Sequence, residues 1–139
     1  MLMEYLRRAV EDQASDLFIV AGGAVSEKLD GRLKALSEEK VFPKETQELI
    51  TEIYRLADRP MDEYLRLGDD DFSFALPGLA RFRVNAYRQR GSLAAVIRVV
   101  AFSIEDAKSI LSPELISDVK SWSSRRVNIV LKKIINQNL

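Results

Sequence analysis

The 139-residue sequence contains neither cysteine nor histidine. Disulfides, thiolate metal sites and histidine-based catalysis are therefore excluded, and any metal ion would need ligands that are all oxygen. The formal net charge is zero, which argues against general nucleic-acid binding. No apolar run reaches the roughly 18 residues of a membrane span, and the amphipathic N-terminus carries acids, unlike a signal peptide. We therefore expect a cytoplasmic protein with no metal site, membrane span or nucleic-acid partner.

The length and composition are typical of one globular domain, since 47% of the residues are hydrophobic and 30% are charged. Apolar spacing predicts a helix over residues 2–13, a second helix opening at Pro43, and a short third helix between Pro60 and Gly68. Six strands are expected, over residues 17–20, 25–29, 32–36, 70–76, 80–89 and 92–102. Short links require antiparallel pairing of the last three strands. The predicted fold is α+β, an antiparallel sheet with helices packed on it.

Positive charge is concentrated in the last strands. The segment from Phe72 to Ile104 contains five arginines and no acidic residue. These are Arg81, Arg83, Arg88, Arg90 and Arg98. If Arg90 and Gly91 form a hairpin tip, as Asp30-Gly31 is expected to do earlier, the apolar residues of both strands fall on one face. The same register places Arg83 directly opposite Arg98 on the other face.

Two like charges that face each other across strands destabilise a sheet, and desolvating an unpaired charge is costly. Something is therefore expected to compensate Arg83 and Arg98. One candidate is a carboxylate from elsewhere in the chain, such as one of the triplet Asp69, Asp70 and Asp71. The other candidate is an external anion such as phosphate, held by two planar guanidinium groups.

Other motifs favour structural roles. The acidic triplet at residues 69–71 could bind a hard cation, although a solvated strand entry is the simpler interpretation. Arg81-Phe82-Arg83 with Tyr87 is similar to an aromatic and basic RNA-binding surface, but the register assigns Phe82 to the core. The basic tail from Ser121 could bind a membrane surface or nucleic acid, although a solvated helix end is the simpler interpretation.

Several motifs resemble those of the PilT-type ATPases that retract type IV pili. Ala14-Ser15-Asp16-Leu17 is similar to the ASDLH element that opens their first strand, and Asp30-Gly31 matches their hairpin. The DFSF, PG and ARFRVN motifs of residues 71–85 look like the corresponding family block almost letter for letter. The resemblance covers roughly residues 1–102, while Phe18 stands where the family usually has histidine.

The resemblance implies a PAS-like N-terminal domain, followed in the family by a RecA-like ATPase domain that binds ATP and Mg²⁺ and assembles as a hexamer. In that family the N-terminal domain closes over bound nucleotide, and two of its arginines approach the phosphates. By motif these are Arg83 and Arg98, with Arg81 and Arg90 as weaker candidates. We therefore expect an arginine pair that has no neutralising carboxylate of its own and is suited to a nucleotide's phosphates.

The 139 residues contain no GxxxxGK[ST] loop, which ATP hydrolysis in this class requires. The expectation is a PilT-like N-terminal domain over residues 1–102 and a helical, basic tail over residues 103–139, with the ATPase domain absent. Such a chain, whether truncated, frameshifted or one product of a split gene, would not turn over ATP alone. Self-association through an uncovered apolar patch, or through the tail, is also expected. The alternative function is a stand-alone PAS-like sensor or interaction module, which needs an internal ligand cavity.

Overall fold

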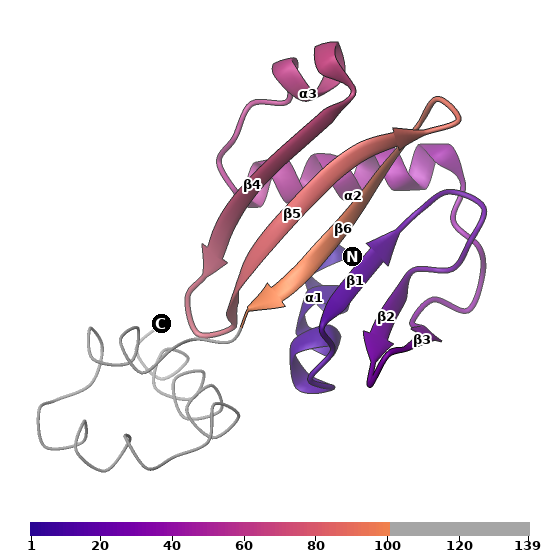
Figure 1. The fold of residues 1–139 in the computed structure, drawn as a ribbon, viewed down its shortest axis with the longest axis vertical. Coiled ribbons are helices and arrows are strands. Elements are labelled where there is room, and N and C mark those ends of the chain that lie inside the picture. The colour runs from indigo at the N-terminus through magenta and orange to yellow at the C-terminus, as the bar shows by residue number, and fades with distance from the viewer. Residues whose placement is uncertain (101–139) are drawn as a thin grey trace, which may run out of the picture. The chain divides into compact units, whose positions relative to one another are not determined.

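The computed structural model describes residues 1–100, which form three helices and six strands (Figure 1). The helices are α1 (Leu2–Glu11), α2 (Pro43–Leu56) and α3 (Asp62–Leu67). The strands are β1 (Asp16–Ile19), β2 (Ser26–Leu29), β3 (Arg32–Ala35), β4 (Asp69–Leu76), β5 (Ala80–Gln89) and β6 (Ser92–Val100). Residues 1–74 and 82–99 make up one compact unit, to which residues 75–81 at the β4–β5 turn do not belong. The predicted tail over residues 103–139 lies outside the described residues.

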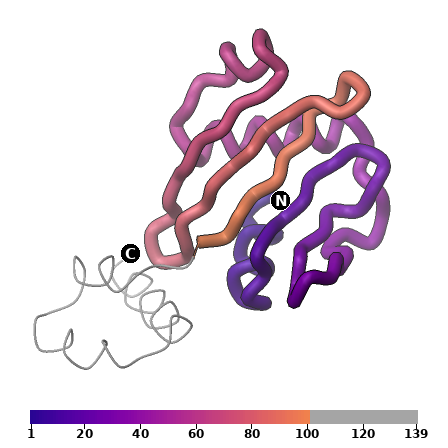
Figure 2. Tube along the Cα trace, viewed as in Figure 1, coloured from indigo at the N-terminus to yellow at the C-terminus, as the bar shows by residue number. Residues whose placement is uncertain are grey.

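The six strands form one sheet in the order β3-β2-β1-β6-β5-β4 (Figures 1 and 2). Two tight turns fix its local registers. Asp30 and Gly31 have φ values of 49° and 79°, and the flanking Leu29 and Arg32 face each other. Arg90 and Gly91 have φ values of 53° and 81°, the same type I′ geometry. This turn type supports the predicted β5–β6 register, in which Gln89 faces Ser92.

Strand β1 provides the non-local pairing of the sheet, because it lies between β2 and β6 and is antiparallel to both. Asp16 of β1 is opposite Lys28 on one side and Arg98 on the other. The first hairpin and the final meander are therefore joined edge to edge through four residues, Asp16–Ile19. This pairing brings a residue near the N-terminus beside the last described strand.

Helices α1 and α2 cover one face of the sheet, and within residues 1–100 no helix covers the other face (Figure 1). The covered face holds the core, in which alternate β5 residues Phe82, Val84 and Ala86 are buried. The ring of Phe82 stacks on Phe74 with centroids 5.2 Å apart, and Tyr54 of α2 stacks on Tyr64 at 5.4 Å. These rings pack against one another in the core, where a sensor domain would need its ligand cavity. Burial of Phe82 also removes the ring from any RNA-binding surface.

Within residues 1–100 the predicted elements are confirmed with small shifts at their ends. Helix α2 begins at Pro43, as predicted, and the Phe42 N–H donates to Glu45 Oε1 at 3.0 Å. Helix α3 begins at Asp62 rather than at Pro60, and Gly68 ends it with a φ of 88°. No helix in the described part of the chain is long and apolar enough to cross a membrane.

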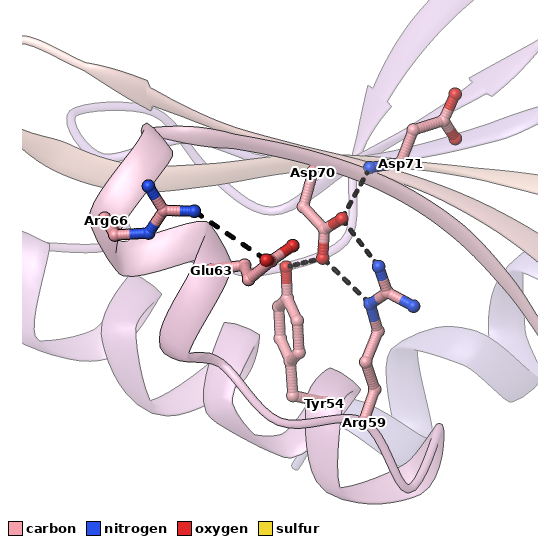
Figure 3. A network of polar contacts seen from close by, with 6 residues as sticks. All are labelled: Tyr54, Arg59, Glu63, Arg66, Asp70 and Asp71. Carbon is pink, nitrogen blue, oxygen red and sulfur yellow. Dashed lines mark hydrogen bonds and ion pairs between the residues drawn. The ribbon is translucent and has the colours of Figure 1, made fainter.

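A polar network fixes the start of β4 against α2 (Figure 3). Asp70 accepts two hydrogen bonds from Arg59, both 2.9 Å long, and one from the Tyr54 hydroxyl at 2.8 Å. The Arg59 guanidinium also lies 4.9 Å from the centre of the Phe72 ring. Because successive strand residues point to opposite faces, Asp71 is directed away from this network. The network therefore positions Asp71 on the uncovered face.

Candidate functional site

Arg83 of β5 and Arg98 of β6 line one pocket on the uncovered face of the sheet. The pocket has a volume of about 220 Å³. Its lining residues are Asp16, Asp71, Arg83, Val84, Asn85, Val96 and Arg98. The structure thus brings together the two arginines that the β5–β6 register predicted to be neighbours. The volume lies below the 300 Å³ or so of a typical small-molecule pocket, and it suits a phosphate group rather than a whole nucleotide.

Each arginine of the pair has an internal carboxylate partner. Arg83 Nη2 lies 4.0 Å from Asp71 Oδ2, and Arg98 Nε lies 3.5 Å from Asp16 Oδ1. The expectation of an arginine pair without its own carboxylates is therefore wrong. Asp71 belongs to the acidic triplet at residues 69–71, whereas Asp16 comes from β1 and is not among the partners that the sequence predicts. The four side chains carry two positive and two negative formal charges.

The two ion pairs are loose. Charge-assisted N–H···O bonds are usually 2.7–2.9 Å long, shorter than either separation here. The side chains of Arg83 and Arg98 are 61% and 67% exposed, so water screens their attraction to the aspartates. Each guanidinium carries five N–H donors, and a single long contact leaves most of them available. Together the two arginines could donate to an anion in the pocket.

The two aspartates differ in how firmly they are held. Asp16 is 9% exposed and accepts a 2.8 Å hydrogen bond from the Ser15 hydroxyl. Asp71 is 64% exposed in its side chain, and its backbone N–H donates to Asp70. One negative charge therefore has a fixed position at the β1 side of the pocket. The charge on the β4 side has room to move.

The other arginines lie outside the pocket. Arg90 is at the tip of the β5–β6 hairpin, roughly 23 Å along the strand from Arg83 at about 3.3 Å per residue. Arg88 donates to the Leu65 carbonyl and joins β5 to α3. Arg81 is exposed and belongs to residues 75–81, not to the compact unit that carries the pocket. The structure therefore places Arg90 far from the central pair, and Arg81 stays a prediction.

The described residues also bear on the acidic triplet, for which a solvated strand entry is a simpler interpretation than a cation site. Within residues 1–100, no group of three or more acidic residues is arranged to hold a metal ion. The acidic triplet is divided between roles, with Asp70 on the Arg59 network and Asp71 beside Arg83. Strand alternation causes this division, because it sends adjacent carboxylates to opposite faces.

Comparison with curated proteins finds relatives among type IV pilus motors. The chain is 29% identical to the type IV pilus ATPase PilU of Pseudomonas aeruginosa over 111 residues, or 80% of this chain. It is 32% identical over 99 residues to the type IV pilus retraction ATPase PilT of the same organism, covering 71% of this chain. A twitching motility protein of Neisseria gonorrhoeae is 25% identical over 92 residues, 66% of this chain and 24% of that protein. The chain spans only 28% of the length of PilU and of PilT. No protein-family model matches the sequence.

Solved structures agree with these relatives. The pilus retraction motor PilT with bound ADP superposes with a TM-score of 0.63 and 27% identity, over 94% of this chain and 41% of that chain. The Legionella pneumophila ATPase DotB shares the fold, with a TM-score of 0.56 and 20% identity over 98% of this chain and 40% of that chain. The sequence and fold likenesses thus define the class of protein as that of the secretion ATPases. More narrowly, the chain carries an N-terminal domain of the PilT-type secretion ATPases.

Proposed function

We propose that this domain is the N-terminal accessory domain of a type IV pilus twitching-motility ATPase. In this proposal Arg83 and Arg98 bind nucleotide phosphates at the interface with a RecA-like ATPase domain. The observation that carries the proposal is that two exposed guanidinium groups line one small pocket on the uncovered face of the sheet. The crystal structure of PilT with bound ADP supports the choice of a nucleotide as ligand.

The chemistry of the pair suits phosphate. Guanidinium groups remain charged at any physiological pH and present planar forks of donors to phosphate oxygens. A nucleotide bound to an ATPase domain would bring its phosphates to this face, and the two positive charges would stabilise charge that develops during transfer. ATP and Mg²⁺ would be held by the ATPase domain, because no phosphate-binding loop occurs in these 139 residues. Cytoplasmic location, hexameric assembly and self-association belong to the same proposal.

Adding the chain to a PilT-type ATPase core that lacks its own N-terminal domain tests this proposal. We expect no ATP turnover above background from the chain alone. The wild-type chain should raise the rate of the core, and a chain with Arg83→Gln and Arg98→Gln should lose about tenfold or more of that stimulation. Steady-state phosphate release measures both rates.

Arg90→Gln is the matched control, because it removes the same charge from the hairpin tip outside the pocket. It should stimulate the core as well as the wild type does. ATP hydrolysis by the purified chain alone, or equal loss of stimulation by Arg90→Gln and the double variant, would count against the proposal.

A further inference from the structure

The carboxylates of the pocket form an ordered row across the sheet with the basic residues. Lys28 faces Asp16, Asp16 faces Arg98, and Asp71 lies beside Arg83. An aspartate therefore flanks each side of the central arginine pair. Both aspartates line the same pocket as the two guanidinium groups, so an anion held there would lie near both carboxylates. The long 3.5 and 4.0 Å separations show that neither contact is a full hydrogen-bonded ion pair.

We infer that Asp16 and Asp71 are specificity-determining residues that compete internally with the ligand for the arginine pair. This inference rests on the proposed function, since it assumes that the pocket binds an anion. In the empty pocket each carboxylate partly neutralises one arginine. When an anion binds, each guanidinium turns from its aspartate toward the ligand.

The competition selects the chemical class of the ligand. A monovalent carboxylate from solution can form only the same kind of ion pair with each arginine that Asp16 and Asp71 already form. The free carboxylate also loses translational freedom when it binds, whereas the two aspartates do not. An anion with two or more charges can bridge both guanidinium groups at once and accept charge-assisted hydrogen bonds from both. The pocket should therefore select the diphosphate or triphosphate group of a nucleotide over acetate or chloride. The exposed Asp71 can move aside, whereas Asp16, held by Ser15, continues to repel a weakly bound anion.

The test measures the affinity of inorganic pyrophosphate and of acetate for the full chain at low ionic strength, by calorimetry and by amide chemical shifts. The chains are the wild type, Asp16→Asn, Asp71→Asn and the double arginine variant. Each asparagine variant should bind pyrophosphate about three- to tenfold more tightly, since one opposing charge is removed from its immediate vicinity. The ratio of pyrophosphate affinity to acetate affinity should be smaller in the same variants than in the wild type. The double arginine variant should lose binding.

Asp69→Asn is the matched control, because it removes the same charge from an exposed position on the same strand. It should change pyrophosphate affinity less than twofold. If the wild type binds through its arginines and Asp16→Asn and Asp71→Asn behave like Asp69→Asn, the competitor role is wrong and the proposed function stands. If the wild type and both asparagine variants fail to bind pyrophosphate, the proposed phosphate site is wrong and the competitor role is overturned with it. Asp71 is exposed, so its variant keeps the test independent of folding defects at Asp16.

Discussion

Replacing Glu27 by glutamine should stabilise the domain at pH 8 and have little effect near pH 4.5. Glu27 lies on the covered face of β2, is 0% exposed, and neither of its carboxyl oxygens has a hydrogen-bond partner among the described residues. Burial raises the pKa of Glu27 from 4.5 to about 7, and the Asp12 carboxyl adds to the rise. Lys34 and Arg8 oppose the rise without cancelling it. A buried charge here therefore costs stability.

The sign of the pH dependence follows from proton binding. Between pH 4.5 and about 7, folded Glu27 holds a proton that the unfolded chain has released. Stability therefore falls as the pH rises through this window, and the penalty is complete above it. A pKa rise of this size corresponds to roughly 3 kcal/mol of unfolding free energy. Glutamine keeps the shape of protonated Glu27 and cannot ionise, so it escapes the penalty.

Urea unfolding of the wild type and Glu27→Gln at pH 5 and pH 8 measures the effect. The gain in unfolding free energy should approach about 3 kcal/mol at pH 8 and should be much smaller at pH 5. Glu38→Gln serves as the control, because Glu38 is exposed and its replacement leaves the core untouched. An equal or lower stability of Glu27→Gln at pH 8 would mean that Lys34 and Arg8 make the ionised form favourable.

The opposite pH dependence is expected for Asp70. Its hydrogen bonds from Arg59, foremost, and from Tyr54 lower the pKa of the Asp70 carboxyl below 3.8, although burial works against them. An asparagine side chain has only one acceptor oxygen. In Asp70→Asn it therefore cannot accept both hydrogen bonds from Arg59 and the one from the Tyr54 hydroxyl. We expect a loss of about 2–3 kcal/mol at pH 7, because charged hydrogen bonds are broken and a part-buried hydroxyl loses its acceptor.

The contribution of Asp70 is present at neutral pH and disappears as the pH falls below 3.8 through the lowered pKa. Thermal unfolding from pH 7 to pH 2 should therefore show the wild type and Asp70→Asn converging in acid. Asp69→Asn, its exposed neighbour, should stay within about 0.5 kcal/mol of the wild type at every pH. A constant difference between the wild type and Asp70→Asn down to pH 2 would show that ionisation of Asp70 is not what stabilises β4.

Local features of the fold could be predicted because short-range chemistry determines them. Asp30-Gly31 and Arg90-Gly91 specify tight turns, and such turns set the register of their own strands. The register set by Arg90-Gly91 predicts that Arg83 and Arg98 are neighbours, and both line one pocket. Pro43 and Gly68 marked helix ends for equally local reasons. The start of α3 was misplaced because Pro60 lies two residues before the helix.

Non-local pairing could not be derived from the sequence in the same way. Asp16 reaches Arg98 only because β1 inserts between β2 and β6, and no pattern within either strand indicates that partner. The division between Asp70 and Asp71 likewise depends on which face of β4 meets α2. Glu27 was missed because a glutamate between Ser26 and Lys28 reads as a polar strand position. Period-two alternation between Val25 and Leu29 is the signal that could have placed it inside.

The most direct test is the structure of this chain in complex with a PilT-type ATPase core and a non-hydrolysable ATP analogue. The quantities to measure are the distances from the Arg83 and Arg98 guanidinium nitrogens to the phosphate oxygens, which show whether the two arginines bind the nucleotide. We expect both arginines within about 2.7–3.2 Å of phosphate oxygens and drawn away from Asp71 and Asp16. Phosphates contacted only by the ATPase core, with both arginines still beside their aspartates, would contradict a nucleotide-binding role for this pocket.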